Sequence, residues 1–143
     1  MNLKNLTIKS QEALQQAQQL AQEFGHQQLE NEHIFKGILE VDENVTPFIL
    51  KKLNVNVELF KKVLDSTLQS FPKVSGGEIM LSRDASTALN EANIIAKKMS
   101  DEYVSIEHLI LAIFKSKSKV AQILKDQGVH EKGLESAIAE IRK

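Results

Sequence analysis

Histidines and carboxylates are the side chains of this sequence that could do chemistry. The histidines are His26, His33, His108 and His130. No two of them stand four residues apart, the spacing at which one helix face presents two rings to a zinc ion, so we predict no metal site. His33 and His108 each lie near the start of an expected short helix, and we interpret both as partly buried, hydrogen-bonded structural residues.

The adjacent carboxylates Asp101 and Glu102 are the other candidates, since paired carboxylates can serve acid–base catalysis. No nucleophile or pocket motif accompanies them, which favours a solvated loop. The sequence has no G-x-x-x-x-G-K-[ST] phosphate loop, no G-x-S-x-G and no H-E-x-x-H. We therefore expect no catalytic residue, no cofactor and no enzyme activity in this chain, and we expect it to act by binding.

The composition is typical of a globular domain. Of 143 residues, 42% are hydrophobic and 26% charged, and the net charge of −1 provides no basic field for nucleic acid or an anionic membrane. Cysteine is absent, which excludes disulfides and thiolate sites. No signal-peptide core follows Met1, and no apolar run approaches the ~20 residues of a membrane span. We expect a cytoplasmic protein that binds neither nucleic acid nor membrane.

Hydrophobic periodicity predicts the helices that would position these side chains. Apolar residues spaced by three and four predict a first helix over 7–24, with Thr7 as its N-cap and Gly25 as its stop. Further helices are expected over 31–40, 46–53 and 57–68. The last of these should bury Leu59, Phe60, Val63, Leu64 and Leu68. No stretch alternates between apolar and polar residues, so we expect no strand.

The pattern restarts after a linker over about 70–80, where Pro72 and two glycines oppose helix. A shift of 75 residues places Thr7 on Ser82 and Glu32-His33 on Glu107-His108, and after one deletion the shift becomes 74. This internal repeat predicts one all-α domain over 1–143. Repeat one (about 6–69) and repeat two (about 81–142) should each supply four helices to a pseudo-two-fold eight-helix bundle, with a groove where the halves meet.

Two copies of one motif carry a family resemblance. The first copy reads Leu6-Thr7, Ala13-Leu14-x-x-Ala17-x-x-x-Ala21 and Glu32-His33-Ile34, and the second reads Leu81-Ser82, Ala88-Leu89-x-x-Ala92-x-x-x-Ala96 and Glu107-His108-Leu109. Over essentially the whole chain this pair resembles the double N-terminal repeat of the Clp family of AAA+ unfoldases. The segments 71–77, 100–105 and 127–135 resemble the ClpB-type disaggregases more than the ClpC and ClpA types.

The resemblance implies a non-catalytic N-terminal domain of a ClpB-type disaggregase. Such a domain binds exposed apolar segments of unfolded or aggregated client proteins and passes them to the pore of a hexamer. The AAA+ modules of that hexamer would lie beyond Lys143, use ATP and Mg²⁺, and work with a DnaK-type chaperone. The resemblance also implies roles in chaperone activity for Thr7, Asp101 and Glu107, whose local alternatives are an N-cap for Thr7 and a first-turn helix charge for Glu107.

Equivalent repeat positions reveal apolar residues that a shared core does not require. Repeat two has Ile94, Tyr103, Ile106 and Leu111 where repeat one has Gln19, Gln28, Asn31 and Lys36; repeat one has Ile8 and Phe48 where repeat two has Arg83 and Gln122. Exposed apolar surface marks binding sites. We therefore predict a client-binding groove that includes Ile94, Ile106 and Leu111. The alternative for each of them is burial between the two halves.

Two other functions remain open. In the protease-linked ClpC and ClpA types the domain binds adaptors or degrons, and the ClpC resemblance would assign phosphorylated arginine to Thr7, Glu32, Ser82 and Glu107, because a carboxylate can pair with a guanidinium. An all-α enzyme is the second alternative. The missing nucleophile, metal set and phosphate loop argue against the enzyme.

Overall fold

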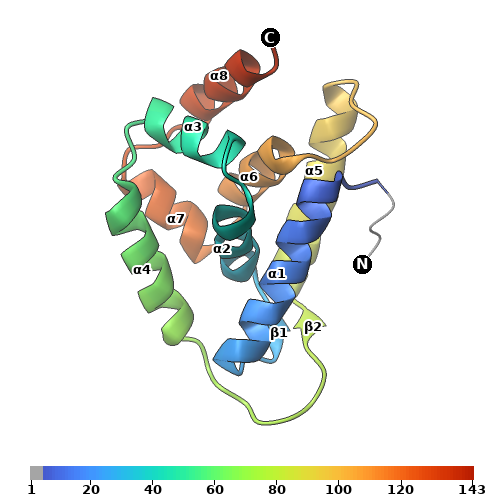
Figure 1. Ribbon diagram of the computed structural model, residues 1–143, viewed down its shortest axis with the longest axis vertical. Helices are drawn as coiled ribbons and strands as arrows, with labels where there is room; N and C mark the ends of the chain where they lie inside the picture. The colour runs from blue at the N-terminus through green and yellow to red at the C-terminus, as the bar shows by residue number, and fades with distance from the viewer. Residues whose placement is uncertain (1–4) are drawn as a thin grey trace.

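The structure, a computed structural model, describes residues 5–143, and these residues form eight helices and two very short strands (Figure 1). The fold is all-α, as predicted. In chain order the elements are α1 (Ile8–Phe24), β1 (Gln28–Leu29), α2 (Asn31–Val41), α3 (Val45–Lys52), α4 (Val57–Gln69), β2 (Met80–Leu81), α5 (Arg83–Lys98), α6 (Ile106–Phe114), α7 (Lys119–Asp126) and α8 (Glu131–Ile141). Within residues 5–143, none of these helices has the length and apolar character that crossing a bilayer would require.

Short polar side chains begin the two long helices in the same way. Thr7 Oγ1 accepts the N–H of Ser10 at 3.1 Å, and Ser82 Oγ accepts the N–H of Ala85 at 3.0 Å. Each hydroxyl satisfies a donor that the helix itself leaves unpaired. Gly25 ends α1 with φ of 75°, a left-handed conformation that glycine adopts without strain. The predicted N-cap and stop of the first helix are confirmed.

Short extended segments of the two repeats pair with each other at two places. Leu29 pairs with Leu81 in a parallel ladder, and Leu6 pairs with Val104 in a parallel bridge. A shift of 75 residues turns the first pairing into the second, so the two contacts are equivalent. The expectation of no strand was wrong, because two-residue strands are too short to show a two-residue alternation.

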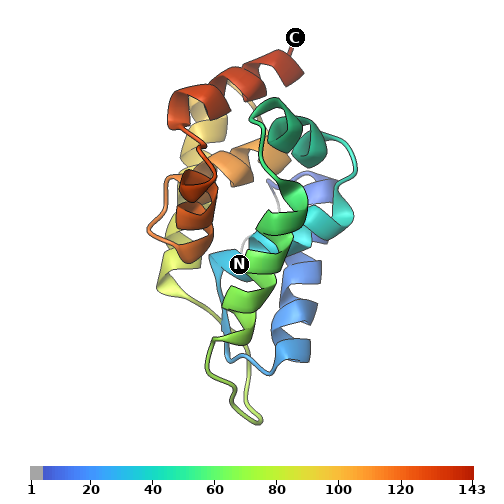
Figure 2. The ribbon, with the colours of Figure 1, turned by 90° about the vertical axis from the view of Figure 1, so that its left-hand side faces the viewer.

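The core centres on α6. Figure 2 shows α1 and α5 at opposite sides of the molecule, with α2 and α6 between them. Helix α6 packs against α1, α2, α3, α5, α7 and α8, and all nine of its residues are buried. A helix that is apolar on every side is stable only when it is covered on every side. The continuous apolar sequence of α6 is therefore the signature of its central position.

Helices α1 and α2 make the closest helix crossing of repeat one. A Cβ atom at Gly37 would lie 2.5 Å from the carbonyl oxygen of Ala13 and 3.1 Å from the amide nitrogen of Ala17. Glycine is therefore required for this approach of two backbones. In repeat two the equivalent residue is Ala112.

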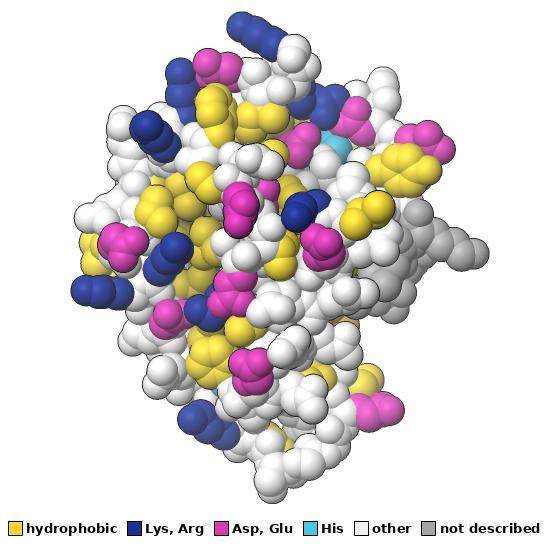
Figure 3. Space-filling model, viewed as in Figure 1, with side chains coloured by type: hydrophobic (Ala, Val, Ile, Leu, Met, Phe, Trp, Pro, Cys, Tyr) yellow, Lys and Arg dark blue, Asp and Glu magenta, His cyan; other side chains and the backbone are white. Residues whose placement is uncertain are grey.

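Helix α4 differs from its predicted pattern. Phe60, Leu64 and Leu68 are buried as expected, but Leu59 is 49% exposed and Val63 is 38% exposed. The prediction that these two are buried was wrong, because α4 contacts α7 and α2 along one narrow face only. In Figure 3 hydrophobic side chains are visible on the side of the molecule where α4 lies.

Candidate functional site

Each repeat buries one histidine at the start of its short helix, in the same hydrogen-bond geometry. His33 Nδ1 accepts the N–H of Glu30, and His108 Nδ1 accepts the N–H of Ser105, both at 2.9 Å. Because Nδ1 is the acceptor, the proton of each neutral ring is on Nε2, which is then a donor. The residues thus have the structural, hydrogen-bonded role predicted for them, and the two repeats differ in what accepts from Nε2.

In repeat one the acceptor is a second histidine. His33 Nε2 lies 2.8 Å from His26 Nδ1, and the His26 ring stacks on Phe24 with centroids 5.2 Å apart. Burial is the main cause that lowers the pKa of both rings, and the neighbouring His26 helps to bring the pKa of His33 to about 4. Phe71 of the linker covers both rings. The pair is therefore neutral at pH 7 and forms part of an aromatic cluster.

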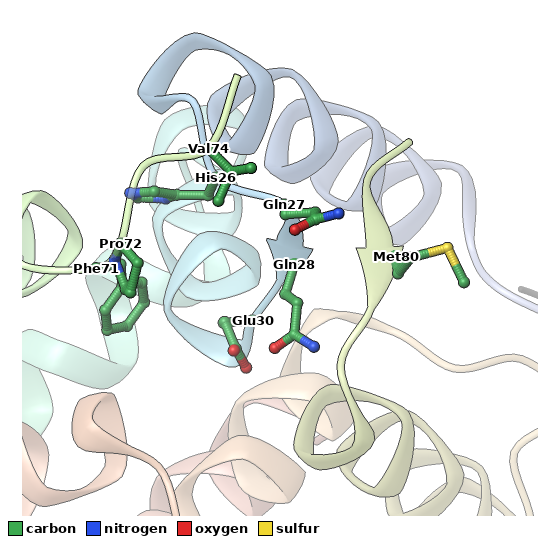
Figure 4. A pocket seen from close by; sticks show the side chains of 8 residues that line it. All are labelled: His26, Gln27, Gln28, Glu30, Phe71, Pro72, Val74 and Met80. Carbon is green, nitrogen blue, oxygen red and sulfur yellow. The ribbon is translucent and has the colours of Figure 1, made fainter. Parts of the chain in front are cut away.

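A cavity of about 450 Å³ lies beside this cluster, between the linker and the two strands (Figure 4). Phe71, Pro72 and Val74 lie on the linker, and Met80 belongs to β2. The remaining lining residues are His26, Gln27, Gln28 and Glu30. None of these eight side chains is a hydroxyl, amine or thiol, and the titratable side chains among them are His26 and Glu30.

In repeat two a carboxylate replaces the second histidine. His108 Nε2 donates to Asp101 Oδ2 at 2.8 Å, and Asp101 holds the position equivalent to His26. The Arg142 guanidinium contacts both oxygens of Asp101, at 2.5 and 2.8 Å, and lies 3.6 Å from Glu107 Oε2. The hydrogen bond from Arg142 is the main cause that lowers the pKa of Asp101, with a further contribution from His108 and against a smaller effect of burial. The cluster is charged at pH 7.

The end of α5 directs Asp101 into this cluster. Ser100 has φ of 61°, and the Asp101 N–H then reaches back to the carbonyl of Ala96 at 2.8 Å. This is the Schellman arrangement, which reverses the chain after a helix. It returns the side chain of Asp101 toward His108 at the start of α6.

Three apolar side chains are exposed on α1, α5 and the α5–α6 loop that carries Asp101. Ile8 is 77%, Ile94 47% and Tyr103 49% exposed, and we call these three residues the Tyr103 corner. Two contacts draw them together: the Thr7 N–H donates to the Val104 carbonyl at 3.0 Å, and the side chain of Asn5 bonds that of Asn93. Figure 3 shows hydrophobic side chains where α1 begins and the α5–α6 loop runs. The equivalent residues of the other repeat are polar. Repeat two has Arg83 where repeat one has Ile8, and repeat one has Gln19 and Gln28 where repeat two has Ile94 and Tyr103.

The predicted client-binding residues divide between this corner and the core. Ile94 belongs to the Tyr103 corner, Thr7 and Asp101 lie within two residues of corner members in the sequence, and Glu107, which is 8% exposed, contacts Arg142 in the charged cluster. Ile106 and Leu111, in contrast, are each 3% exposed. The prediction that these two line an open groove was wrong, because α6 is covered by helices on all sides. Their alternative, burial between the halves, is what the structure shows.

All four residues assigned to phosphorylated arginine make internal contacts, and Glu32 and Ser82 show this for their two repeats. Glu32 is 4% exposed, and its Oε2 accepts the N–H of Val120 at the start of α7, at 2.9 Å. Burial raises the pKa of Glu32. Ser82 is 5% exposed and caps α5. Neither side chain faces solvent as a guanidinium site would require.

Sequence reasoning missed Arg142. No periodicity marks it, and with the shift of 74 its counterpart in repeat one is Leu68, which is fully buried. The repeat comparison signalled Ile8 and Tyr103 together with Ile94 and Phe48, but only the folded chain shows that these four are exposed whereas Ile106 and Leu111 are buried. Within residues 5–143, no three His, Asp or Glu residues gather in a way suited to a metal ion.

Comparisons with known proteins agree with this architecture. The family model described as the Clp repeat (R) N-terminal domain matches residues 5–127. Chaperone protein ClpB of Bacteroides thetaiotaomicron is 50% identical over all 143 residues of the chain, which spans 17% of the length of that relative. Among solved structures, the Hsp104 N-terminal domain of Candida albicans superposes with a TM-score of 0.85 at 21% identity, covering 97% of this chain and 92% of that one.

A third comparison concerns a peptide complex. A structure described as a complex of the ClpV N-domain with a VipB peptide has a TM-score of 0.79 at 19% identity, covering 96% of this chain and 86% of that one. At such identity it shows the shared fold alone. The family model and the ClpB relative do not favour the protease-linked alternative. The chain belongs to the Clp repeat N-terminal domain family, and over its whole length it is similar to ClpB chaperones.

Proposed function

We propose that this domain binds exposed apolar segments of unfolded or aggregated client proteins at the Tyr103 corner. One observation carries the proposal: Ile8, Ile94 and Tyr103 are exposed and apolar, whereas the equivalent positions of the other repeat hold Arg83, Gln19 and Gln28. The fold works with polar residues at these positions, so stability does not require the apolar ones. Apolar side chains that a core does not need are the usual sign of an interaction surface.

Binding at this corner is weak and tolerant of sequence. Burying three partly exposed side chains contributes a few kcal/mol at roughly 25 cal/mol per Å². Ordering an unfolded client offsets much of that gain. A site of this strength suits a chaperone that must accept many clients and release them. The complex of the ClpV N-domain with a VipB peptide supports the proposal, because it is a case of a peptide ligand on this fold.

The rest of the proposal concerns the whole chaperone, of which this chain spans a small part. The AAA+ modules of a hexamer bind ATP and Mg²⁺ and thread the client through the pore, in cooperation with a DnaK-type chaperone in the cytoplasm. The domain acts at the pore entrance by raising the local concentration of client segments.

Two matched variants test the surface. Tyr103→Ser and Leu59→Ser each remove an apolar side chain that is 49% exposed, but only Tyr103 belongs to the corner. Binding of unfolded casein, followed by backbone NMR shifts and by fluorescence anisotropy, should weaken severalfold in Tyr103→Ser and stay unchanged in Leu59→Ser. The reverse result, with shifts concentrated on α4, would place the client on the other face and overturn the proposal.

A further inference from the structure

Arg142 joins the C-terminal end of the chain to the α5–α6 loop and the start of α6. It follows the end of α8, and its guanidinium reaches Asp101 in the α5–α6 loop and Glu107 in the first turn of α6. The two contacts to Asp101 use different nitrogens on different oxygens, at 2.5 and 2.8 Å. This is the bidentate geometry in which a planar guanidinium fixes the orientation of a carboxylate as well as its charge.

The carboxylates of Asp101 and Glu107 can lie close to each other because the Arg142 guanidinium offsets their charge. Asp101 Oδ2 also accepts from His108 Nε2, so the Asp101 side chain is held from two directions. Glu107 is 8% exposed and has little water to screen it from Asp101. Without Arg142, two negative groups would share one partly desolvated site, and the loop that carries Asp101 could relieve the repulsion by moving outward.

The loop that would move carries the exposed ring of Tyr103. Tyr103 lies two residues after Asp101, and the next residue, Val104, pairs with Leu6 in the bridge that places Ile8. Repeat one contains no counterpart of this device. Its equivalent positions are His26 and Leu68, and the loop there is held by aromatic packing instead.

We infer that Arg142 is a positioning residue for client binding, which fixes the α5–α6 loop so that Tyr103 and Ile8 are presented together. The inference rests on the proposed function of the Tyr103 corner. A surface held in its binding arrangement before the client arrives loses less conformational freedom on binding, and it therefore binds more tightly. Arg142 does not touch the client; it acts through Asp101 and Glu107.

The test compares Arg142→Met with Lys52→Met in the 143-residue chain. Lys52 also pairs with a carboxylate on α8, that of Glu140 at 3.2 Å, but this ion pair includes no residue of the Tyr103 corner or of the Asp101 cluster. Lys52→Met therefore controls for the loss of one cation beside α8. We expect Arg142→Met to weaken binding of unfolded casein by about five- to tenfold, as for other losses of preorganisation. We expect Lys52→Met to bind like the unaltered chain.

Two further readouts separate positioning from general stability. Arg142→Met should also lower the melting temperature, because Asp101 and Glu107 lose their cation in a partly desolvated site, so casein affinity is compared at a temperature at which both variants are fully folded. The pKa of the Asp101 carboxyl, followed by ¹³C NMR, should rise toward its ordinary value, because the guanidinium that lowers it is gone. Arg142→Lys keeps the charge without the fork and should recover part of the affinity; it also serves as the test variant if Arg142→Met does not fold.

Casein binding at the unaltered affinity in Arg142→Met, or in Arg142→Lys if only that variant folds, would overturn the inference while leaving the corner as the client site. Unaltered binding in Tyr103→Ser would instead overturn the proposed function, and the inference with it. The two failures are therefore distinguishable from the same set of titrations.

Discussion

His33 in repeat one and His108 in repeat two share a backbone setting and differ in the residue that faces Nε2. His26 makes the first cluster neutral and aromatic, and Phe71 of the linker closes over it. Asp101 makes the second cluster ionic, and Arg142 completes it. The repeat position held by His26 in one half and by Asp101 in the other thus decides the chemistry of each cluster. The histidine gives an aromatic cluster that packs against the linker, and the aspartate gives an ionic cluster next to the loop that carries Tyr103. Duplication supplied the scaffold, and divergence at a few positions supplied the difference in chemistry.

Lowering the pH should give the largest difference between the two clusters, measured as their contributions to the free energy of unfolding. The folded pKa of His33 is about 4 against 6.5 for an ordinary histidine, so between these values the unfolded chain binds protons that the folded chain does not. The contribution of this histidine to the free energy of unfolding is complete above pH 6.5 and falls by about 3 kcal/mol as the pH drops to 4. Urea denaturation across this range measures the loss.

The Asp101 cluster responds in a lower pH window. The folded pKa of Asp101 lies below 3.8, so its contribution is present above that pH and is lost as the pH falls further.

NMR titration should find the His33 ring unprotonated at pH 5. A protonated His33 at that pH, with stability unchanged down to pH 4, would contradict the assignment of a neutral pair.

Gly37→Ala tests the next difference between the repeats, the closer helix crossing in repeat one. The added methyl would lie 2.5 Å from the Ala13 carbonyl oxygen, so backbone must move, and we expect a loss of about 1–3 kcal/mol in urea denaturation. The control is Gly133→Ala on α8, where the nearest atom is Leu53 Cδ2 at 3.4 Å. That substitution should stabilise by about 0.5–1 kcal/mol, because alanine favours helix. Equal effects would show that α1 and α2 do not require glycine.

Glu107→Gln should separate stability from binding in repeat two. We expect it to change the free energy of unfolding by less than about 1 kcal/mol, because glutamine keeps the shape of the side chain and a charge in the first turn of a helix has an effect of that size. Casein binding should weaken, because Arg142 loses one of its two carboxylates. Glu32→Gln is the matched variant in repeat one; it lies away from the corner, and casein affinity should not respond to it. Equal loss of affinity in both variants would favour a symmetric site and count against the Tyr103 corner.

Ser100→Gly should have the smallest effect on the free energy of unfolding, and it should raise this free energy. Ser100 has φ of 61°, and its repeat-one counterpart Gly25 has φ of 75°. Glycine removes the strain of a side chain in this conformation but increases the freedom of the unfolded chain, so we expect a gain of about 0.5 kcal/mol. Gly25→Ser should lose about 1 kcal/mol by the same reasoning. A loss of stability in Ser100→Gly, measured by thermal denaturation, would mean that the serine side chain is needed for the turn.

Particular residues show how far sequence reasoning reached. The starts and ends of helices follow from local chemistry, so Thr7 as N-cap and Gly25 as stop were predictable. The repeat and the family motif were also visible, because they depend on residue identity alone. The split of Ile8, Ile94 and Tyr103 from Ile106 and Leu111 was not predictable, since all five are apolar residues with polar counterparts. Periodicity defines a face of a helix but does not say how many neighbours cover it.

The sequence by itself therefore determined the all-α class, the duplicated architecture and the family, because these depend on local propensity and on pattern. Only the tertiary structure decided which apolar residues face solvent and which charged residues meet. Helix α6 is buried on all sides by six other helices, Glu32 is bonded to Val120, and Arg142 reaches Asp101 across 41 residues of chain. Contacts between residues so distant in sequence depend on how whole helices pack, and no window along the chain contains that information.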